Sequence, residues 1–251
     1  MENTHWNGKR IAFLGDSITE GVGVNRGECF WNYLEEKLGC ISYSFGKSGA
    51  LYRDLLPQVD EMVKQCGDNI DATIIFAGTN DYNGGLPMGE WYTPPVDQEV
   101  IVGYDGDKPL YATRKRREYS MDISTFRGSI NAVMDKVRRY YPTQQIIVMT
   151  PIHRAYANYG GSNIQYDELH TDKGGFYVDE YIEVVKEATN VWACDIIDLH
   201  SKSGLFPLND KQAEIFFCSA KTDRLHPNAN GHMRIAETMA VAMKSIPVFS
   251  R

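Results

Sequence analysis

The stretch "FLGDSITEG" at residues 13–21 places Ser17 directly after an acidic residue, where a short apolar run ends. The run "RIAFLG" at 10–15 has the length and composition of a buried β-strand. Ser17 or Asp16 could therefore cap a following helix. Alternatively, Ser17 could be a nucleophile at the carboxyl end of a parallel strand, where α/β sheets bind their ligands. The choice depends on what the rest of the chain brings to that edge.

Short apolar runs of this kind recur along the chain and alternate with segments of helical period. The other strand candidates are "CISYSF" (40–45), "ATIIFAG" (72–78), "QIIVMT" (145–150) and "CDIIDL" (194–199). Apolar residues spaced by three and four predict helices within 30–38, 51–63, 123–140 and 176–189, and another after Pro227. Parallel strands need right-handed crossovers, which carry the helices back over the sheet faces. The sequence therefore predicts an α/β fold, a three-layer α/β/α sandwich around a parallel five-stranded sheet.

The size and charge of the chain limit the classes of protein to consider. The 251 residues fit one domain, 1–251. The net charge of −7 disfavours nucleic acid as a partner, and no apolar run reaches the roughly 18 residues of a membrane span. We expect a soluble, cytoplasmic protein that needs no membrane; the sequence leaves a homo-oligomer open. Five scattered cysteines, without a Cys-x-x-Cys pair, are expected to be reduced thiols.

Two stretches interrupt the alternation of strands and helices. Residues 82–120 have little periodicity and many Gly, Pro and aromatic residues, and residues 153–175 also follow a strand end. Long loops inside a compact domain are usually functional. We expect both stretches to form walls of a pocket, with 82–120 as an insertion near the active site. The basic run "RKRR" at 114–117 is expected on a solvated loop or helix start.

A serine nucleophile needs a base, a group that orients the base, and donors for the oxyanion. The segment "TDRLHPNANGH" places Asp223 three residues before His226, and Pro227 stands at a natural first helical position. A turn or tight loop of this spacing could set the carboxylate against Nδ1 and leave Nε2 facing outward. A surface pair of no functional role is the other interpretation of these two residues.

Candidate oxyanion donors follow the second and third strands. Gly49 in "FGKSGA" lacks a side chain, so its N–H could approach a ligand closely, and Asn80 in "GTND" has an amide that can donate. With the N–H of Ser17 they could form a three-donor hole. Each could also be an ordinary turn residue. Their joint occurrence at successive strand ends favours the functional interpretation.

These segments resemble the SGNH hydrolases, also called GDSL esterases and lipases. "GDSITEG", "GKSGA", "GTND" and "DRLHPN" correspond in order to the four blocks of that family and extend over nearly the whole chain. The resemblance implies a flavodoxin-like sheet, Ser17 as nucleophile, His226 as base and Asp223 as the orienting group. It also implies an oxyanion hole of Ser17, Gly49 and Asn80, without metal or other cofactor.

Other motifs carry less weight. "GVGVNRG" at 21–27 has the wrong glycine spacing for a dinucleotide fingerprint, and the remaining histidines lack metal-ligand spacing. We predict no cofactor and no metal site. Asp16, His153 and Trp91 are candidates for substrate binding, His153 because it follows the fourth strand and Trp91 because it lies in the aromatic insertion.

The expected function is that of a serine esterase acting through an acyl-enzyme on a small-molecule or carbohydrate ester. Aromatic residues of the insertion, such as Trp91, Tyr104 and Tyr111, would suit sugar rings, which favours short acyl groups such as acetyl. The alternatives are an acyltransferase on the same scaffold, a lysophospholipase or thioesterase, and a non-catalytic carbohydrate-binding module.

Overall fold

The computed structural model describes residues 4–248 and has a five-stranded parallel sheet at its centre. The strands are β1 (Arg10–Gly15), β2 (Ile41–Ser44), β3 (Ala72–Phe76), β6 (Gln145–Met149) and β9 (Asp195–Ile197). Their order in the sheet is β2-β1-β3-β6-β9, and all four pairings are parallel. The predicted strands are all confirmed, as are the five-stranded sheet and its flavodoxin-like order.

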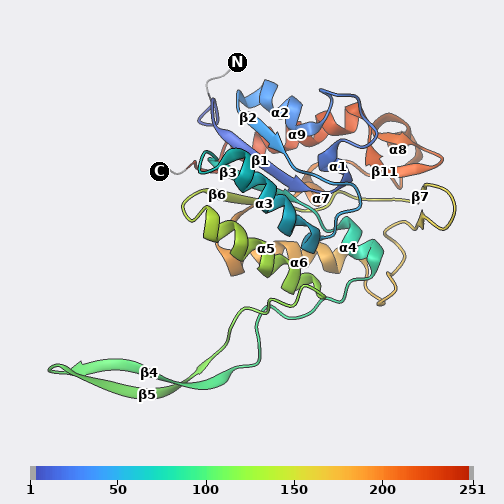
Figure 1. The fold of residues 1–251 in the computed structure, drawn as a ribbon. Helices are drawn as coiled ribbons and strands as arrows, with labels where there is room; N and C mark the ends of the chain where they lie inside the picture. Colours follow the sequence, from blue (N-terminus) through green and yellow to red (C-terminus); the bar gives the residue numbers. More distant parts are fainter. Residues whose placement is uncertain (1–3, 249–251) are drawn as a thin grey trace.

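Helices cover both faces of the sheet and complete the three layers (Figure 1). One face is covered by α3 (Leu55–Cys66), α5 (Phe126–Tyr140) and α6 (Val178–Trp192). The opposite face is covered by α2 (Phe30–Leu38) and α9 (Ala229–Met243). Side chains of β1 alternate between the two cores, because successive residues of a strand point to opposite faces: Leu14 packs with the first set and Phe13 with the second.

Short helical elements lie along the connections between these strands and helices. These are α1 (Ser17–Glu20), the 3₁₀ helix η1 (Tyr52–Asp54), α4 (Thr79–Gly84), α7 (Leu199–Lys202) and α8 (Asp210–Phe216). A second sheet of order β10-β11-β7-β8 lies beside them. It consists of β10 (Phe217–Ser219), β11 (Asp223–Pro227), β7 (Ala157–Asn158) and β8 (Ile164–Gln165).

The expectation that residues 82–120 form a wall near the active site is wrong for most of that segment. β4 (Val96–Asp105) and β5 (Lys108–Arg116) form an antiparallel hairpin that projects from the body, on the side away from α1 and β11 (Figure 1). The run 114–117, expected on a loop or helix start, instead begins within β5. Both faces of this hairpin are largely exposed. Its strands therefore lack the alternation of apolar and polar residues by which a strand with one buried face is recognised in a sequence.

Two further features of the chain follow from the structure. Within residues 4–248, no helix is both long and apolar enough to cross a membrane. The five cysteines are free, as expected from their scattered positions.

Candidate active site

Ser17 is the first residue of α1 and follows β1 by one residue. The alternatives left open by the sequence are resolved here: Asp16 is the N-cap of α1, and its Oδ1 accepts a hydrogen bond from the Ile18 N–H at 3.0 Å. Burial raises the pKa of Asp16 to about 6, against the lowering effect of that bond and of the charges on His226 and Arg154. The cap fixes the helix start and leaves the Ser17 hydroxyl for another partner.

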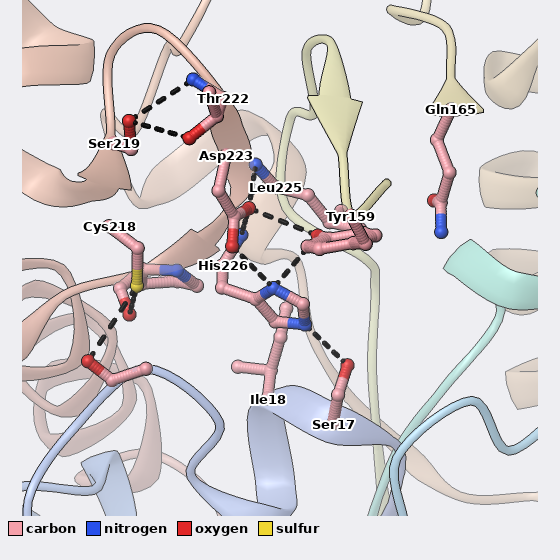
Figure 2. Close-up of polar contacts among 12 residues, drawn as sticks. Ser17, Ile18, Tyr159, Gln165, Cys218, Ser219, Thr222, Asp223, Leu225 and His226 are labelled. Carbon is pink, nitrogen blue, oxygen red and sulfur yellow. Dashed lines mark hydrogen bonds and ion pairs between the residues drawn. The ribbon is translucent and has the colours of Figure 1, made fainter. Parts of the chain in front are cut away.

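That partner is His226, 209 residues further along the chain, whose Nε2 lies 2.8 Å from Ser17 Oγ. The other ring nitrogen, Nδ1, lies 2.9 Å from Asp223 Oδ2 (Figure 2). Both Ser17 and His226 are nearly buried, with 5% and 6% of their surface exposed. A carboxylate cannot donate, so Nδ1 carries the proton and Nε2 presents its lone pair to the serine. The result is an unbroken hydrogen-bonded chain from carboxylate to hydroxyl.

Asp223 and His226 occupy β11, and the carboxylate is fixed by the backbone as well as by the imidazole. Asp223 Oδ1 accepts from the N–H groups of Leu225 and His226 at 3.1 and 3.0 Å. Burial would raise the pKa of Asp223, but the hydrogen bonds from His226 and its charge hold that pKa below its ordinary value. The carboxyl group therefore stays ionised at neutral pH.

Pro227 is not the first residue of a helix, as the sequence suggested. It ends β11, and α9 begins at Ala229 with Asn228 as its N-cap. The Asn228 side chain caps the helix by accepting hydrogen bonds from Asn230 N–H and Gly231 N–H. The expectation drawn from the sequence includes no residue for this cap.

Gly49 lies in the loop after β2 with a φ of 77°, a left-handed conformation that favours glycine. No atom lies within 4 Å of the position a Cβ would take, so the space beside this residue is open. Within residues 4–248, neither the Gly49 N–H nor the Ser17 N–H donates a hydrogen bond. Both amides are thus free to receive an acceptor.

Asn80 in α4 is held against the same loop. Its Nδ2 donates to the carbonyl oxygen of Ala50 at 3.0 Å, which uses one of the two amide hydrogens. The next residue, Asp81, accepts from the Tyr52 N–H at 3.1 and 3.0 Å with its two oxygens. Two consecutive residues of α4 therefore fix the position of the Gly49 loop.

Arg154 is a buried residue that the sequence did not single out. Its guanidinium donates to the Thr79 carbonyl at 2.9 Å, to the Thr79 hydroxyl at 3.0 Å and to Gln165 Oε1 at 2.6 Å. Burial lowers the pKa of Arg154, and nearby charges including Glu168 oppose that shift. The arginine ties the start of α4 to the segment 153–175.

The same segment contributes Tyr159, which follows β7 and contacts both Asp223 and His226 (Figure 2). The sequence predicts that the segment forms a pocket wall but does not single out this residue. The segment contains Tyr156, Tyr159 and Tyr166, and only the pairing of β7 with β11 distinguishes one of them.

Three residues proposed for substrate binding have other partners in the structure. The Asp16 side chain is buried and caps α1, as described. Trp91 donates from Nε1 to Glu187 Oε2 at 2.8 Å and packs against the core between the sheet and α3, α5 and α6, away from the triad. His153 Nδ1 lies 2.6 Å from Glu168 Oε1, and its ring faces His200 at 3.7 Å between centroids.

His153 and His200 line a cavity of about 470 Å³ together with Glu168 and residues of α6. Burial, followed by the charge of His153, lowers the pKa of His200. Within the part of the chain that the structure describes, no group of three or more His, Cys, Asp and Glu side chains is placed to hold a metal ion.

Comparisons with known proteins show to which family the chain belongs. Residues 13–234 match the model of the GDSL-like lipase/acylhydrolase family. A search of curated proteins found no match. Among solved structures, a protein from Lactobacillus plantarum is 23% identical with a TM-score of 0.71, the alignment covering 97% of this chain and 100% of that one.

Two further solved structures share the fold. A member of the lipolytic G-D-S-L family from Veillonella parvula is 14% identical with a TM-score of 0.61, covering 95% of this chain and 100% of that one. An acetyl xylan esterase is 18% identical with a TM-score of 0.56, covering 93% and 98%. Given the family match over most of its length, the chain belongs to the GDSL-like lipase/acylhydrolase family and is a serine ester hydrolase.

Proposed function

We propose that Ser17, His226 and Asp223 hydrolyse carboxylic esters through a covalent acyl-enzyme. The observation that carries this proposal is the hydrogen-bonded chain from Asp223 through His226 to Ser17, at 2.9 and 2.8 Å. Ser17 Oγ attacks the ester carbonyl carbon while Nε2 takes its proton, and Asp223 stabilises the imidazolium that forms. The same proton then passes to the leaving alcohol, and a water molecule repeats the sequence to release the acid.

The oxyanion of the tetrahedral intermediate is assigned to three donors. These are the N–H groups of Ser17 and Gly49 and the second Nδ2 hydrogen of Asn80. The free amides and the open space at Gly49 support this assignment. Donors that are already oriented stabilise the developing charge without reorganisation at the moment of reaction.

For the substrate, we propose short acyl groups, foremost acetyl, carried by a carbohydrate. The acetyl xylan esterase among the structural neighbours supports this choice. The aromatic residues that lie near the triad belong to residues 153–175 and not to the hairpin: Tyr156, Tyr159 and Tyr166 are exposed, and Tyr159 lies beside the triad. Exposed aromatic rings at that place could stack on a sugar ring.

The first test is hydrolysis of a p-nitrophenyl ester series from acetate to palmitate by wild type and Ser17→Ala. We expect activity to fall steeply with acyl length and to drop by roughly 10⁴-fold or more in the variant, because the hydroxyl is the nucleophile. Ser245→Ala, at an exposed residue of the turn after α9, serves as a matched control and should retain wild-type activity. A Ser17→Ala protein with a tenth of wild-type turnover would refute the assignment.

The substrate class requires its own comparison, between acetylated xylooligosaccharides and long-chain lysophospholipids. Faster deacetylation of the sugar supports the proposal, and a strong preference for the lysophospholipid contradicts it. Capture of the acyl group by an added sugar alcohol faster than by water would identify an acyltransferase. Sugar binding without turnover would identify a binding module.

A further inference from the structure

Tyr159 is placed by backbone pairing between the second sheet's strands β7 and β11. Asn158 N–H donates to the Thr222 carbonyl at 2.8 Å, and Arg224 N–H donates to the Tyr156 carbonyl at 3.1 Å. Asp223 is the register partner of Ala157, two residues before the tyrosine. The tyrosine and the carboxylate it contacts therefore belong to one hydrogen-bonded unit, whose geometry does not depend on side-chain packing alone.

The Tyr159 hydroxyl lies between the two members of the Asp223–His226 pair. Its oxygen is 3.1 Å from Asp223 Oδ1 and 2.9 Å from His226 Nδ1, and the two rings lie 5.6 Å apart between centroids (Figure 2). The carboxylate, the imidazole N–H and the hydroxyl thus form a closed triangle of polar contacts. Tyr159 reaches the carboxylate oxygen that the imidazole does not use.

The single proton of the hydroxyl determines how this triangle is connected. A carboxylate only accepts, so the contact with Asp223 Oδ1 requires Tyr159 to donate there. The hydroxyl can then offer His226 only a lone pair, which requires a proton on Nδ1. The contact between Asp223 Oδ2 and His226 also requires a proton on Nδ1. The Tyr159 hydroxyl and the Asp223 carboxylate therefore select the same tautomer of His226. That tautomer leaves Nε2 free to accept the Ser17 proton.

Burial keeps the Tyr159 hydroxyl protonated, as its hydrogen bond to Asp223 requires. Burial, followed by the negative charge of Asp223, raises the pKa of Tyr159, so the phenol stays protonated across the physiological range. Tyr159 as a whole is 40% exposed, although its hydroxyl contacts Asp223 and His226.

We propose that Tyr159 is a positioning residue of this active site: its hydroxyl holds Asp223 and provides a second acceptor for the Nδ1 proton of His226. The inference rests on the proposed function, because it assigns a role to a group that acts through the base. When Ser17 gives up its proton, the positive charge on the imidazolium is shared between two acceptors at Nδ1. Tyr159 touches neither the substrate carbonyl nor the nucleophile in this role.

The test is Tyr159→Phe, which keeps the ring and removes only the hydroxyl. Hydrogen bonds to charged groups are worth more than neutral ones, so we expect kcat on p-nitrophenyl acetate to fall about tenfold. KM should stay within about twofold, because substrate contacts are unchanged. Tyr140→Phe is the matched control, since Tyr140 is the last residue of α5, is 48% exposed and has no hydroxyl hydrogen bond within residues 4–248. It should retain wild-type kcat.

Nitrogen NMR of His226 separates positioning from mere packing. Wild type should show the Nδ1–H tautomer alone, whereas Tyr159→Phe should show a mixture of tautomers or an exchange-broadened Nδ1 proton. Unchanged kcat together with an unchanged spectrum would overturn the proposal. A thermal melt of Tyr159→Phe within a few degrees of wild type excludes misfolding as the cause of a loss.

Comparing the two variants separates the role of Tyr159 from that of the triad. An inactive Ser17→Ala protein with a fully active Tyr159→Phe protein would leave the triad in place and remove only the role of Tyr159. An active Ser17→Ala protein would remove both.

Discussion

At the scale of single residues, Asn80 tests the oxyanion hole most directly. One Nδ2 hydrogen is committed to Ala50, so the amide is oriented before any substrate binds and its second hydrogen is available. We expect Asn80→Ala to lower kcat by roughly 10²- to 10³-fold with little change in KM, because the lost donor acts on charge present only in the transition state. Steady-state kinetics on p-nitrophenyl acetate measure both constants.

Asn69→Ala is the matched control for that variant, because Asn69 is exposed in the turn before β3. It should match wild type. If Asn80→Ala kept a third or more of wild-type kcat, the Asn80 amide would not be an oxyanion donor.

The residues that could be predicted from sequence are those set in short motifs. Ser17, Gly49, Asn80, Asp223 and His226 each lie in a segment whose residue types suggest a chemical role, and the structure brings them to one sheet edge. Tyr159 and Arg154 contact partners in other segments of the chain, and no local sequence pattern indicates those contacts. The contact of Trp91 with Glu187 of α6 is likewise one that the aromatic composition of its segment does not indicate.

At the scale of elements, Asp81 joins α4 to η1 through the Tyr52 N–H and is fully buried. Burial raises its pKa from 3.8 to about 7, against the lowering effect of the Tyr52 hydrogen bond. The folded state therefore holds this proton more tightly than the unfolded state, and the contribution of Asp81 to the free energy of unfolding falls as pH rises from about 4 to about 7.

An asparagine can still accept from Tyr52 N–H but has no charge to bury. We expect Asp81→Asn to stabilise the fold relative to wild type by on the order of 4 kcal/mol more at pH 8 than at pH 4, since the pKa of Asp81 rises from 3.8 to about 7 and each pKa unit corresponds to about 1.4 kcal/mol. Urea unfolding at the two pH values measures this difference. Asp68→Asn, an exposed carboxyl, should show no such change, and an Asp81→Asn difference that is flat with pH would contradict the burial argument.

The strands that could be predicted are apolar runs with the length of a buried strand, and those that could not are either very short or exposed on both faces. β1, β3 and β6 are continuous buried runs, which is why a parallel sheet could be predicted. β7 and β8 have two residues each, too few to leave a pattern. The hairpin had one local signal, the Gly106-Asp107 pair at its turn, but no buried face to give its strands a period of two.

At the scale of the whole molecule, the arm formed by β4 and β5 stands apart from the body (Figure 1). Ile101, Tyr104, Leu110 and Tyr111 are among its exposed side chains, so they add little to the hydrophobic stabilisation of the domain. The base of the arm is already closed, because Thr93 N–H donates to the Glu118 carbonyl at 2.9 Å and Tyr92 pairs with Tyr119. A short linker could therefore join residues 95 and 117 without strain on the core.

We expect replacement of 96–116 by a four-residue Gly-Ser linker to leave the melting temperature within about 3 °C of wild type, because the removed side chains contribute little buried apolar area. Activity on p-nitrophenyl acetate should stay within twofold, because the arm lies away from α1 and β11, which carry the triad. Circular dichroism melts and steady-state kinetics test the two parts separately. A fall of 10 °C would mean that the body depends on the arm, and a stable protein with lost turnover would mean that the arm reaches the site during catalysis.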